Sequence, residues 1–189
     1  MEPPVLQFET PSSLLVCSPS NSGKTSFVER LLENASLMFK TPPKSILYCY
    51  GSVWQPIFDE MEKCVKNIRF FKGLPTEDEF LDIRDSNDGH FVCVLDDLMS
   101  QSSNSSFVEK IVYAGSHHLN MTIVCLMQNL YQKGKVMRTI SLNMHYYILF
   151  ENRRDMEQIL RFGRQVLPHQ SKFFFDSYKN QRFQNMDIS

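Results

Sequence analysis

The sequence predicts an α/β fold in which a mainly parallel sheet carries helices on both faces. Two observations support this. Short apolar runs of strand length alternate along the chain with segments whose apolar residues recur at helical spacing. The runs are almost continuously apolar, which is typical of parallel strands buried on both faces. The 189 residues suit one domain with a sizeable core, and we expect an N-terminal arm at 1–11 followed by a single domain at 12–189.

The apolar runs are the expected strands. Each is short and bounded by polar or turn residues. In a parallel sheet, ligands bind beyond the carboxyl ends of the strands, so the residues at those ends are the informative ones. The predicted strands are Ser12–Cys17, Lys44–Tyr50, Ile68–Pro75, His90–Asp97, Met121–Gln128 and His145–Phe150.

The amphipathic segments are the expected helices. In the first, Val28, Leu31 and Leu32 recur at helical spacing. In the third, Thr76 and Glu79 have the spacing of a capping box, which indicates a helix start. The predicted helices are Lys24–Ala35, Gln55–Val65, Thr76–Asp85, Asn104–Ser116, Arg154–Val166 and Gln170–Lys179.

Composition indicates an intracellular, soluble protein. Hydrophobic residues make up 42% of the chain, enough for a core. No apolar run reaches membrane-spanning length, and the N-terminus lacks the basic start and apolar centre of a signal peptide. The five cysteines form no CxxC pair, so we expect reduced thiols and no metal or disulfide role; they are Cys17, Cys49, Cys64, Cys93 and Cys125.

Charge is distributed unevenly along a chain whose formal net charge is only −1. Acidic residues are in excess over 1–130, and Lys and Arg are in excess over 131–189. A basic C-terminal third could face nucleic acid or the nucleotide of a neighbouring subunit. It could equally be an ordinary solvated surface, and charge alone leaves both interpretations open.

The stretch "SPSNSGKTS" resembles a phosphate-binding loop between the first strand and the first helix. It matches Gly-x4-Gly-Lys-Ser/Thr except that Ser18 replaces the first glycine. Lys24 is expected to neutralise the β- and γ-phosphates, and the Thr25 hydroxyl to ligate Mg²⁺. The alternative is a serine-rich turn before a helix. The residues expected to bind the nucleotide are Ser20, Asn21, Ser22, Gly23, Lys24, Thr25 and Ser26.

Polar residues at two later strand ends complete a predicted catalytic set of a P-loop NTPase. Asp96 would hold Mg²⁺ through its water shell, and Asp97 would polarise the attacking water. Gln128 would hydrogen-bond both the γ-phosphate and the water. The alternatives are a helix cap with a solvated turn for the acids, and a strand-end cap for the amide. The expected cofactors are ATP and Mg²⁺. ATP is expected in preference to GTP because the guanine-specificity motif NKxD is absent.

The order of motifs resembles the genome-packaging ATPases of the FtsK/HerA superfamily, with a RecA/FtsK-like fold. The similarity covers about Ser12 to Tyr178 and is greatest to the polinton/adintovirus type and related, poxvirus-like, large DNA viruses. The "QN" after a strand, followed by "RTISLN", is more specific than the phosphate loop. The motifs are "SPSNSGKT", "YGSVWQPIFD", "FFKGLP", "VLDDLM", "GSHHLNMTIVCLMQNLY", "RTISLNMHYYILFENRRD" and "GRQV".

The resemblance implies a homo-oligomeric, hexameric ring that moves double-stranded DNA into a viral capsid with ATP, in the nucleus or virus factory of a host cell. It implies that Lys24 and Thr25 are the Walker A residues, Asp96 and Asp97 the Walker B residues, and Gln128 the sensor.

The resemblance further implies an arginine finger that is given to the next subunit. Arg138 is the candidate, with Arg153 or Arg154 as the runner-up. Lys133 and Lys135, on a glycine-containing segment, could contact DNA phosphates in a central pore.

The chain departs from the family pattern in its final residues. Family members continue past the last helix into a strand with a "YGYLLIDL"-like run, whereas this sequence reads "QRFQNMDIS" there. We therefore expect the family's C-terminal strand to be missing.

Two other functions remain open. A small P-loop kinase acting on a nucleoside-like acceptor fits the length, but no Arg-rich lid segment is found. The other function is that of a nucleotide-binding switch that moves no DNA.

Less specific residues have simpler interpretations. We expect His117 and His118 at a turn or a helix end and not at a metal. We expect Tyr48, Tyr50 and Trp54 in packing and not in base stacking.

Overall fold

The computed structural model describes residues 6–51, 53–86, 88–98, 107–112, 119–131, 140 and 143–180. The chain divides into two compact units, Met1–Phe150 and Glu151–Ser189, and each is described by itself. The single domain expected over 12–189 stays a prediction.

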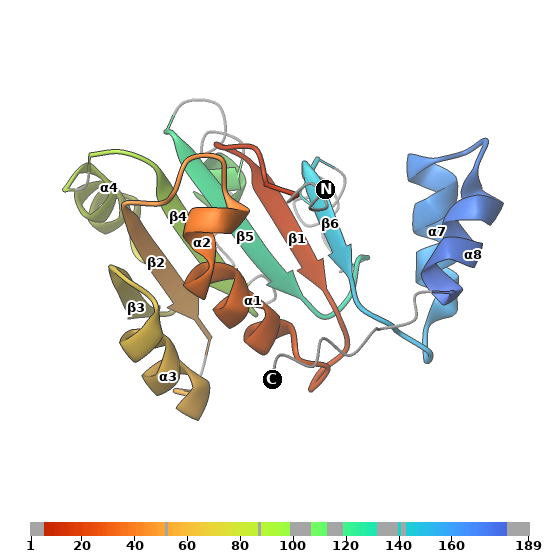
Figure 1. The fold of residues 1–189 in the computed structure, drawn as a ribbon, viewed down its shortest axis with the longest axis horizontal. Coiled ribbons are helices and arrows are strands. Elements are labelled where there is room, and N and C mark those ends of the chain that lie inside the picture. The colour runs from red at the N-terminus through yellow and green to blue at the C-terminus, as the bar shows by residue number, and fades with distance from the viewer. Residues whose placement is uncertain are drawn as a thin grey trace, which may run out of the picture. The chain divides into compact units, whose positions relative to one another are not determined.

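The described residues of the first unit form a six-stranded sheet in the order β3-β2-β4-β5-β1-β6 (Figure 1). Every neighbouring pair of strands is parallel, so all carboxyl ends lie at one edge. The predicted parallel α/β sheet is confirmed. The strands are β1 Ser13–Cys17, β2 Ser45–Tyr50, β3 Ile68–Lys72, β4 Phe91–Asp96, β5 Met121–Met127 and β6 Tyr146–Leu149.

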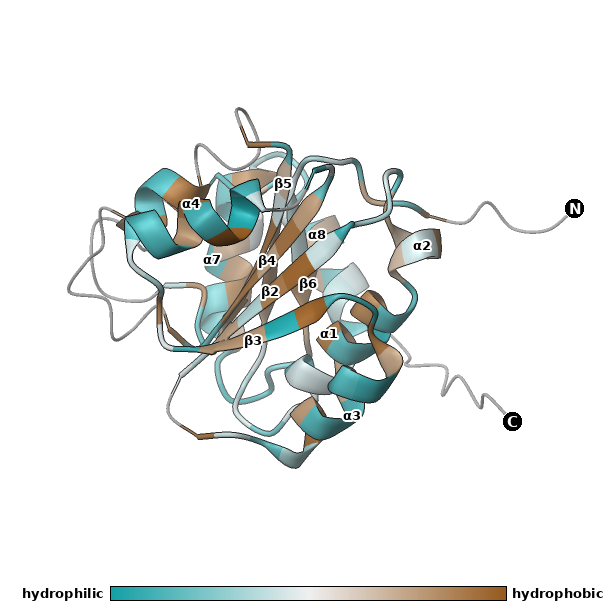
Figure 2. Ribbon diagram, turned by 90° about the vertical axis from the view of Figure 1, so that its left-hand side faces the viewer, coloured by the Kyte–Doolittle hydropathy of each residue, from teal (hydrophilic) through white to brown (hydrophobic). Residues whose placement is uncertain are grey.

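Helices cover both faces of this sheet, as predicted (Figure 2). One face carries α1 Lys24–Glu33, α2 Ala35–Met38 and α3 Pro56–Cys64, and the other carries α4 Glu77–Asp85. The capping box of α4 is present, because the Glu79 N–H donates to Thr76 Oγ1 and the Thr76 N–H to Glu79 Oε2. The helix predicted over Asn104–Ser116 is described only at 107–112, where it is helical.

The first helix is shorter than the sequence predicts. It ends at Glu33, because Asn34 leaves the helical conformation and its side-chain amide donates to the Arg30 carbonyl. A second, four-residue helix then begins at Ala35. Asparagine competes with the helical backbone in this way through its own short side chain.

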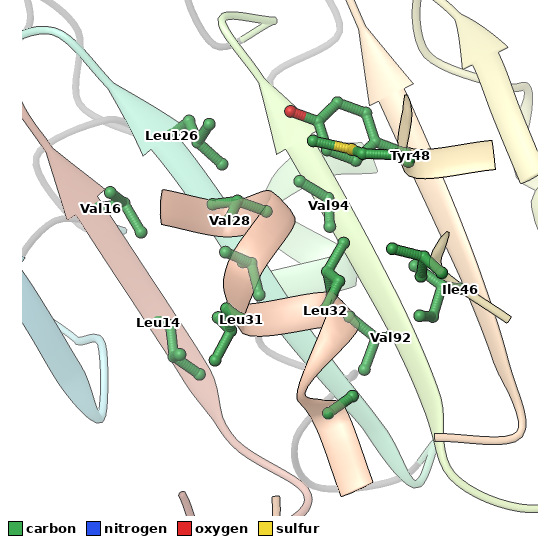
Figure 3. Packing of buried hydrophobic residues seen from close by; sticks show 14 of the residues in the cluster. Leu14, Val16, Val28, Leu31, Leu32, Ile46, Tyr48, Val92, Val94 and Leu126 are labelled. Atoms are coloured by element: carbon green, nitrogen blue, oxygen red, sulfur yellow. The ribbon is translucent and has the colours of Figure 1, made fainter. Parts of the chain in front are cut away.

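The core lies between α1 and the sheet (Figure 3). Val28, Leu31 and Leu32 project from the helix and are almost completely buried. They pack among apolar side chains that point to one face from three neighbouring strands: Leu14 and Val16 of β1, Leu126 of β5, and Val92 and Val94 of β4. Each such side chain contributes about 1.5–3 kcal/mol by leaving water. This burial holds the start of α1 near the strand ends.

The cysteines are free thiols, as expected. Cys64 is exposed, and the four strand cysteines are buried. Burial raises the pKa of Cys17 and of Cys125 to about 12, so both stay protonated and unreactive at neutral pH.

The second unit contains α7 Met156–Val166 and α8 Ser171–Lys179, which pack together through Phe162 and Phe174. Asn152 stabilises the turn before α7, because its side-chain oxygen accepts hydrogen bonds from the backbone N–H groups of Arg154 and Asp155. No helix in the described parts of the chain has the length and apolar character to cross a membrane.

The buried side chain of His90 makes the stability of the fold depend on pH. His90 is 1% exposed, its Nε2 lies 2.8 Å from Thr122 Oγ1, and burial lowers its pKa below the ordinary value. In the unfolded chain the His90 side chain takes up a proton at about pH 6.5, whereas in the folded chain it does so only at a lower pH. The contribution of neutral His90 to the stability of the folded state is therefore complete above about pH 6.5. It is lost as the pH falls toward the lowered pKa of His90.

We expect the melting temperature of the wild type to fall more than that of His90→Gln between about pH 7.5 and about pH 5.5. Glutamine keeps a hydrogen-bonding amide at this position but does not titrate. Calorimetric scans of both proteins make the comparison. Equal falls in the two proteins would show that His90 is not the group responsible.

Candidate nucleotide-binding site

A cavity of about 560 Å³ opens at the carboxyl edge of the sheet. It gathers the loop after β1, the end of β4, the end of β5 and the start of α3. The predicted phosphate-loop residues, both acids and the sensor amide all line it, although they come from distant parts of the sequence. The lining residues are Ser20, Asn21, Ser22, Gly23, Lys24, Thr25, Ser26, Gln55, Pro56, Ile57, Asp96, Asp97 and Gln128.

The loop leads directly into α1. Gly23 is the N-cap and adopts φ 88°, a left-handed conformation that glycine takes without strain, and its carbonyl accepts the first helical hydrogen bond from Phe27. Lys24 and Thr25 are the first helical residues, and no acidic residue occupies the first turn. The free N–H groups of this turn and its positive dipole end therefore favour an anion in the cavity.

The structure shows how serine is accommodated at the first glycine position of the predicted phosphate loop. Ser18 is not among the residues with positive φ; the loop places that conformation at Asn21 and Gly23. The Ser18 side chain is buried, and its oxygen accepts a hydrogen bond of 2.6 Å from the Ser22 hydroxyl. Its backbone N–H donates to the Met127 carbonyl, which ties the loop to the end of β5. The Ser18 hydroxyl thus stabilises the loop through a hydrogen bond within it.

Asp96 is a buried acid at the end of β4. It is 5% exposed, and its Oδ2 accepts a hydrogen bond of 2.7 Å from the Tyr48 hydroxyl. Burial raises the pKa of Asp96, the Tyr48 hydrogen bond and the nearby Lys24 charge act in the opposite direction, and Asp97 adds to the rise. The two opposing contacts favour the ionised form that a cation would need.

Asp97 reaches the same cavity through an unusual backbone conformation. Successive strand residues point to opposite faces, so a regular strand would send Asp97 away from Asp96. Instead Asp97 has φ 55° and the chain turns out of β4 at this residue. Both carboxylates consequently line one cavity. Left-handed non-glycine residues carry strain and are frequent at functional sites.

Gln128 links the loop after β1 to Asp97. Its Nε2 donates to Asp97 Oδ2 at 3.1 Å, and its Oε1 accepts from the Ser20 hydroxyl at 3.1 Å. The carboxylate can only accept, which fixes the amide nitrogen on the Asp97 side and the oxygen on the Ser20 side. The side chain therefore spans the cavity from the loop to the second acid.

The oxygen donors at the cavity fit a magnesium ion that arrives with a nucleotide. Thr25 and Asp96 both line the cavity and supply a hydroxyl and a carboxylate. No group of three or more His, Cys, Asp or Glu side chains in the described parts of the chain could hold a metal by itself. Mg²⁺ is commonly held in this way, by one or two protein oxygens together with phosphates and water.

Sequence reasoning missed four residues of this region. Gln55, Pro56 and Ile57 line the cavity from the start of α3. They follow β2, which neighbours β4, so the rule that ligands lie beyond strand ends could have identified them. For Tyr48 the sequence predicts packing only. It does pack, but its hydroxyl also contacts Asp96, and no signal in the sequence indicates that contact.

Apart from Lys24, the basic residues predicted to act lie either outside the described residues or in the second unit. Arg138, Lys133 and Lys135 lie outside the described residues, as do His117 and His118. Arg153 and Arg154 belong to the second unit, where Arg153 Nε pairs with Glu151 Oε1 at 2.6 Å. Arg154 makes no ion pair among the described residues. Of the two runner-up residues for the arginine finger, only Arg153 has an ion-pair partner in the described part of the chain, and that pair is exposed.

Comparison with known proteins gives a structural match and no sequence match. No family model and no curated protein matches the sequence. Among solved structures, the genome packaging NTPase B204 from Sulfolobus turreted icosahedral virus 2, in complex with ATPγS, superposes with a TM-score of 0.52. The two chains share 12% identity over 90% of this chain and 87% of that one.

The fold is that of a P-loop NTPase. The six-stranded parallel sheet of the described residues and the match to B204 both support this assignment. At 12% identity the match establishes the fold and no residue roles.

Two glycines with similar positive φ allow a controlled test of the loop. Gly23 (φ 88°) and Gly73 (φ 81°) would each place an added Cβ in open space, but only Gly23 lines the cavity. Substitution by alanine should lower the free energy of unfolding by about 1–2 kcal/mol at either site. Only Gly23→Ala should also weaken binding of a fluorescent ATP analogue. Equal nucleotide affinity in the two variants would contradict the placement of the phosphates at this loop.

Proposed function

We propose that this protein is an ATP-hydrolysing motor that moves double-stranded DNA and packages a viral or polinton-like genome into a capsid. The observation that carries the proposal is the hydrogen-bonded path from Ser20 through Gln128 to Asp97 across the cavity. It connects the loop that would hold the phosphates with the acid that would orient the attacking water. The fold, which resembles that of a genome packaging NTPase solved with ATPγS, supports the same function. Such a motor would act in the nucleus or virus factory of an infected cell.

In this mechanism the first turn of α1 binds the phosphates. Its backbone N–H groups donate to phosphate oxygens, and Lys24 places its ammonium group against the β- and γ-phosphates. Among the described residues Lys24 makes no ion pair, so its charge is available to a ligand. Thr25 and Asp96 would hold Mg²⁺, which neutralises charge on the β- and γ-oxygens when bound.

Asp97 and Gln128 would control the attacking water. The Asp97 carboxylate accepts a hydrogen bond from the water and orients it toward the γ-phosphate. Gln128 now bridges Ser20 and Asp97 with both ends of its amide. A γ-phosphate in the cavity offers the Gln128 Nε2 a second acceptor. The amide could then exchange partners and report which nucleotide is bound.

A second positively charged side chain, beside Lys24 and the bound Mg²⁺, would speed hydrolysis, because negative charge spreads over the γ-phosphoryl oxygens in the transition state. Lys24 is the only cation among the described residues that line the cavity. We propose that Arg138 of a neighbouring subunit supplies the second charge in a homo-oligomeric, hexameric ring. Lys133 and Lys135 of the same segment would contact DNA phosphates in the pore.

ATP hydrolysis measured with and without duplex DNA, beside the mass of the assembly in solution, tests the proposal. We expect duplex DNA to raise the rate, and an oligomer to form. A small P-loop kinase would instead need an acceptor and would be indifferent to DNA. Hydrolysis that no DNA stimulates, by a protein that stays monomeric, would contradict the motor.

DNA binding should be weak, independent of sequence and steeply dependent on salt, because the contacts are to phosphates. Lys133→Ala combined with Lys135→Ala should weaken binding to all duplexes alike and flatten the plot of log affinity against log salt. Lys66→Ala with Lys72→Ala, which removes the same charge from exposed positions near β3, is the control. An unchanged slope in the first double variant would place the DNA contacts elsewhere.

The two acids should be separable by substitution with asparagine. Asp97→Asn keeps a residue that tolerates left-handed φ, so it should bind Mg²⁺·ATP normally but hydrolyse it about 100-fold or more slowly. Asp96→Asn should instead lose affinity for the nucleotide only when Mg²⁺ is present. Steady-state rates and nucleotide titrations with and without Mg²⁺ distinguish the two. The same loss of nucleotide affinity in both variants would remove the division of roles.

A finger supplied by a neighbour can be restored by mixing subunits. Arg138→Ala should bind ATP but hydrolyse it roughly 10³–10⁵-fold more slowly. Mixed with Lys24→Ala subunits it should recover part of the activity, because intact pockets then meet intact arginines. For comparison, Arg154→Ala subunits are mixed with Lys24→Ala subunits in the same way. Recovery with Arg154→Ala and none with Arg138→Ala, in rings shown by mass to be mixed, would transfer the role to Arg154.

A further inference from the structure

A buried tyrosine stands one strand away from the acid that we propose for Mg²⁺. The Cα of Tyr48 on β2 pairs with that of Val94 on β4, two residues before Asp96. Residues two apart on a strand share a face and lie about 6.6 Å apart along it, a distance that a tyrosine side chain can cover. Figure 3 shows the Tyr48 ring directed toward the end of β4. The spacing therefore brings the hydroxyl to the carboxylate.

The contact is a short hydrogen bond in a buried place. The Tyr48 hydroxyl donates to Asp96 Oδ2 at 2.7 Å, with Tyr48 0% and Asp96 5% exposed. Hydrogen bonds to an ionised acceptor are roughly twice as strong as neutral ones. Little water is available to replace this donor if it is removed. The bond therefore has a strong influence on the orientation of the carboxylate.

Packing fixes the direction of the tyrosine ring. Its centroid lies 5.2 Å from that of Phe58 on α3 and 5.2 Å from that of Phe70 on β3. The ring is thus held by two elements besides its own strand. A hydroxyl on a ring that is packed on two sides is a well-fixed donor, whereas the Asp96 carboxylate lines an open cavity.

We infer that Tyr48 is a positioning residue that holds Asp96 by Oδ2 and so leaves Oδ1 turned to the water shell of a nucleotide-bound Mg²⁺. The inference rests on the proposed function. Tyr48 itself is not among the residues that line the cavity, so it acts only through Asp96. Loss of the hydroxyl would free the carboxylate to rotate. It would weaken metal binding and leave metal-free nucleotide binding, which depends on the loop after β1, unchanged.

Binding of Mn²⁺ in place of Mg²⁺ tests this without any measurement of activity. The free Mn²⁺ signal in electron paramagnetic resonance is followed during titration of the protein saturated with ATPγS. Tyr48→Phe, which keeps the ring, should bind Mn²⁺ about 10-fold more weakly, at the lower end of the range for residues that support a metal ligand. Its affinity for ATPγS in the presence of a chelator should equal that of the wild type.

Tyr50→Phe is the matched control. Tyr50 lies on the same face of β2 and its ring contacts Phe58 and Phe70 as well, but no hydrogen bond of its hydroxyl is seen among the described residues. It should bind Mn²⁺ as the wild type does. A Tyr48→Phe protein that melts at a lower temperature yet binds Mn²⁺ normally would overturn the inference, because the hydroxyl would then serve folding alone.

A double variant separates action through Asp96 from a general effect. In an Asp96→Asn background, Tyr48→Phe should cause no further loss of Mn²⁺ affinity. A further 10-fold loss would contradict the inference while leaving the proposed function intact. A wild-type protein that binds no ATPγS at all would overturn both proposals, so the two failures are distinguishable.

Discussion

The packing of one helix on the sheet positions the whole site. Val28, Leu31 and Leu32 of α1 are buried among side chains from β1, β4 and β5. Because these residues begin four positions after Lys24, their burial holds the start of the helix at the carboxyl edge of the sheet. The same strands end there in Asp96 and, after β5, in Gln128. One apolar contact surface thus brings the predicted phosphate loop to the polar strand ends.

The strand order then decides which groups can meet. The strand that leads into the loop, β1, is separated from the acidic strand β4 by β5. Gln128 therefore lies between the loop and the acids, where its amide contacts both Ser20 and Asp97. On the other side of β4, strand β2 brings the Tyr48 hydroxyl to Asp96. Each acid is consequently held by a side chain from a different neighbouring strand.

Patterns within short windows of the sequence predicted most of the fold. The apolar run at Ser12–Cys17 and the capping box at Thr76 and Glu79 depend on local chemistry, and both were identified correctly. The break at Asn34 was missed, because helical periodicity continues through it while the asparagine side chain competes for the backbone. Periodicity also does not indicate which strands pair with each other, so the order of the strands in the sheet could not be predicted from it.

The same limit applies to the cavity. Lys24, Asp96 and Gln128 could be proposed because a spacing motif and strand-end positions mark them. The left-handed turn at Asp97 and the bond from Tyr48 depend on contacts between strands that are far apart in sequence. In the sequence Ser18 is only a replaced glycine, whereas in the structure its buried hydroxyl accepts a hydrogen bond from Ser22 within the loop. Such roles require the three-dimensional arrangement.

The central claim is that this cavity binds a nucleotide with Mg²⁺. Titration calorimetry of ATPγS into the wild type, with and without Mg²⁺, tests it most directly. Lys24→Ala is the test variant, and Lys44→Ala, which removes an exposed lysine outside the cavity, is the control. We predict one nucleotide per chain, tighter with Mg²⁺, and a loss of about 10-fold or more in affinity for Lys24→Ala only. Binding that is absent in the wild type, or equally strong in Lys24→Ala, would contradict the claim.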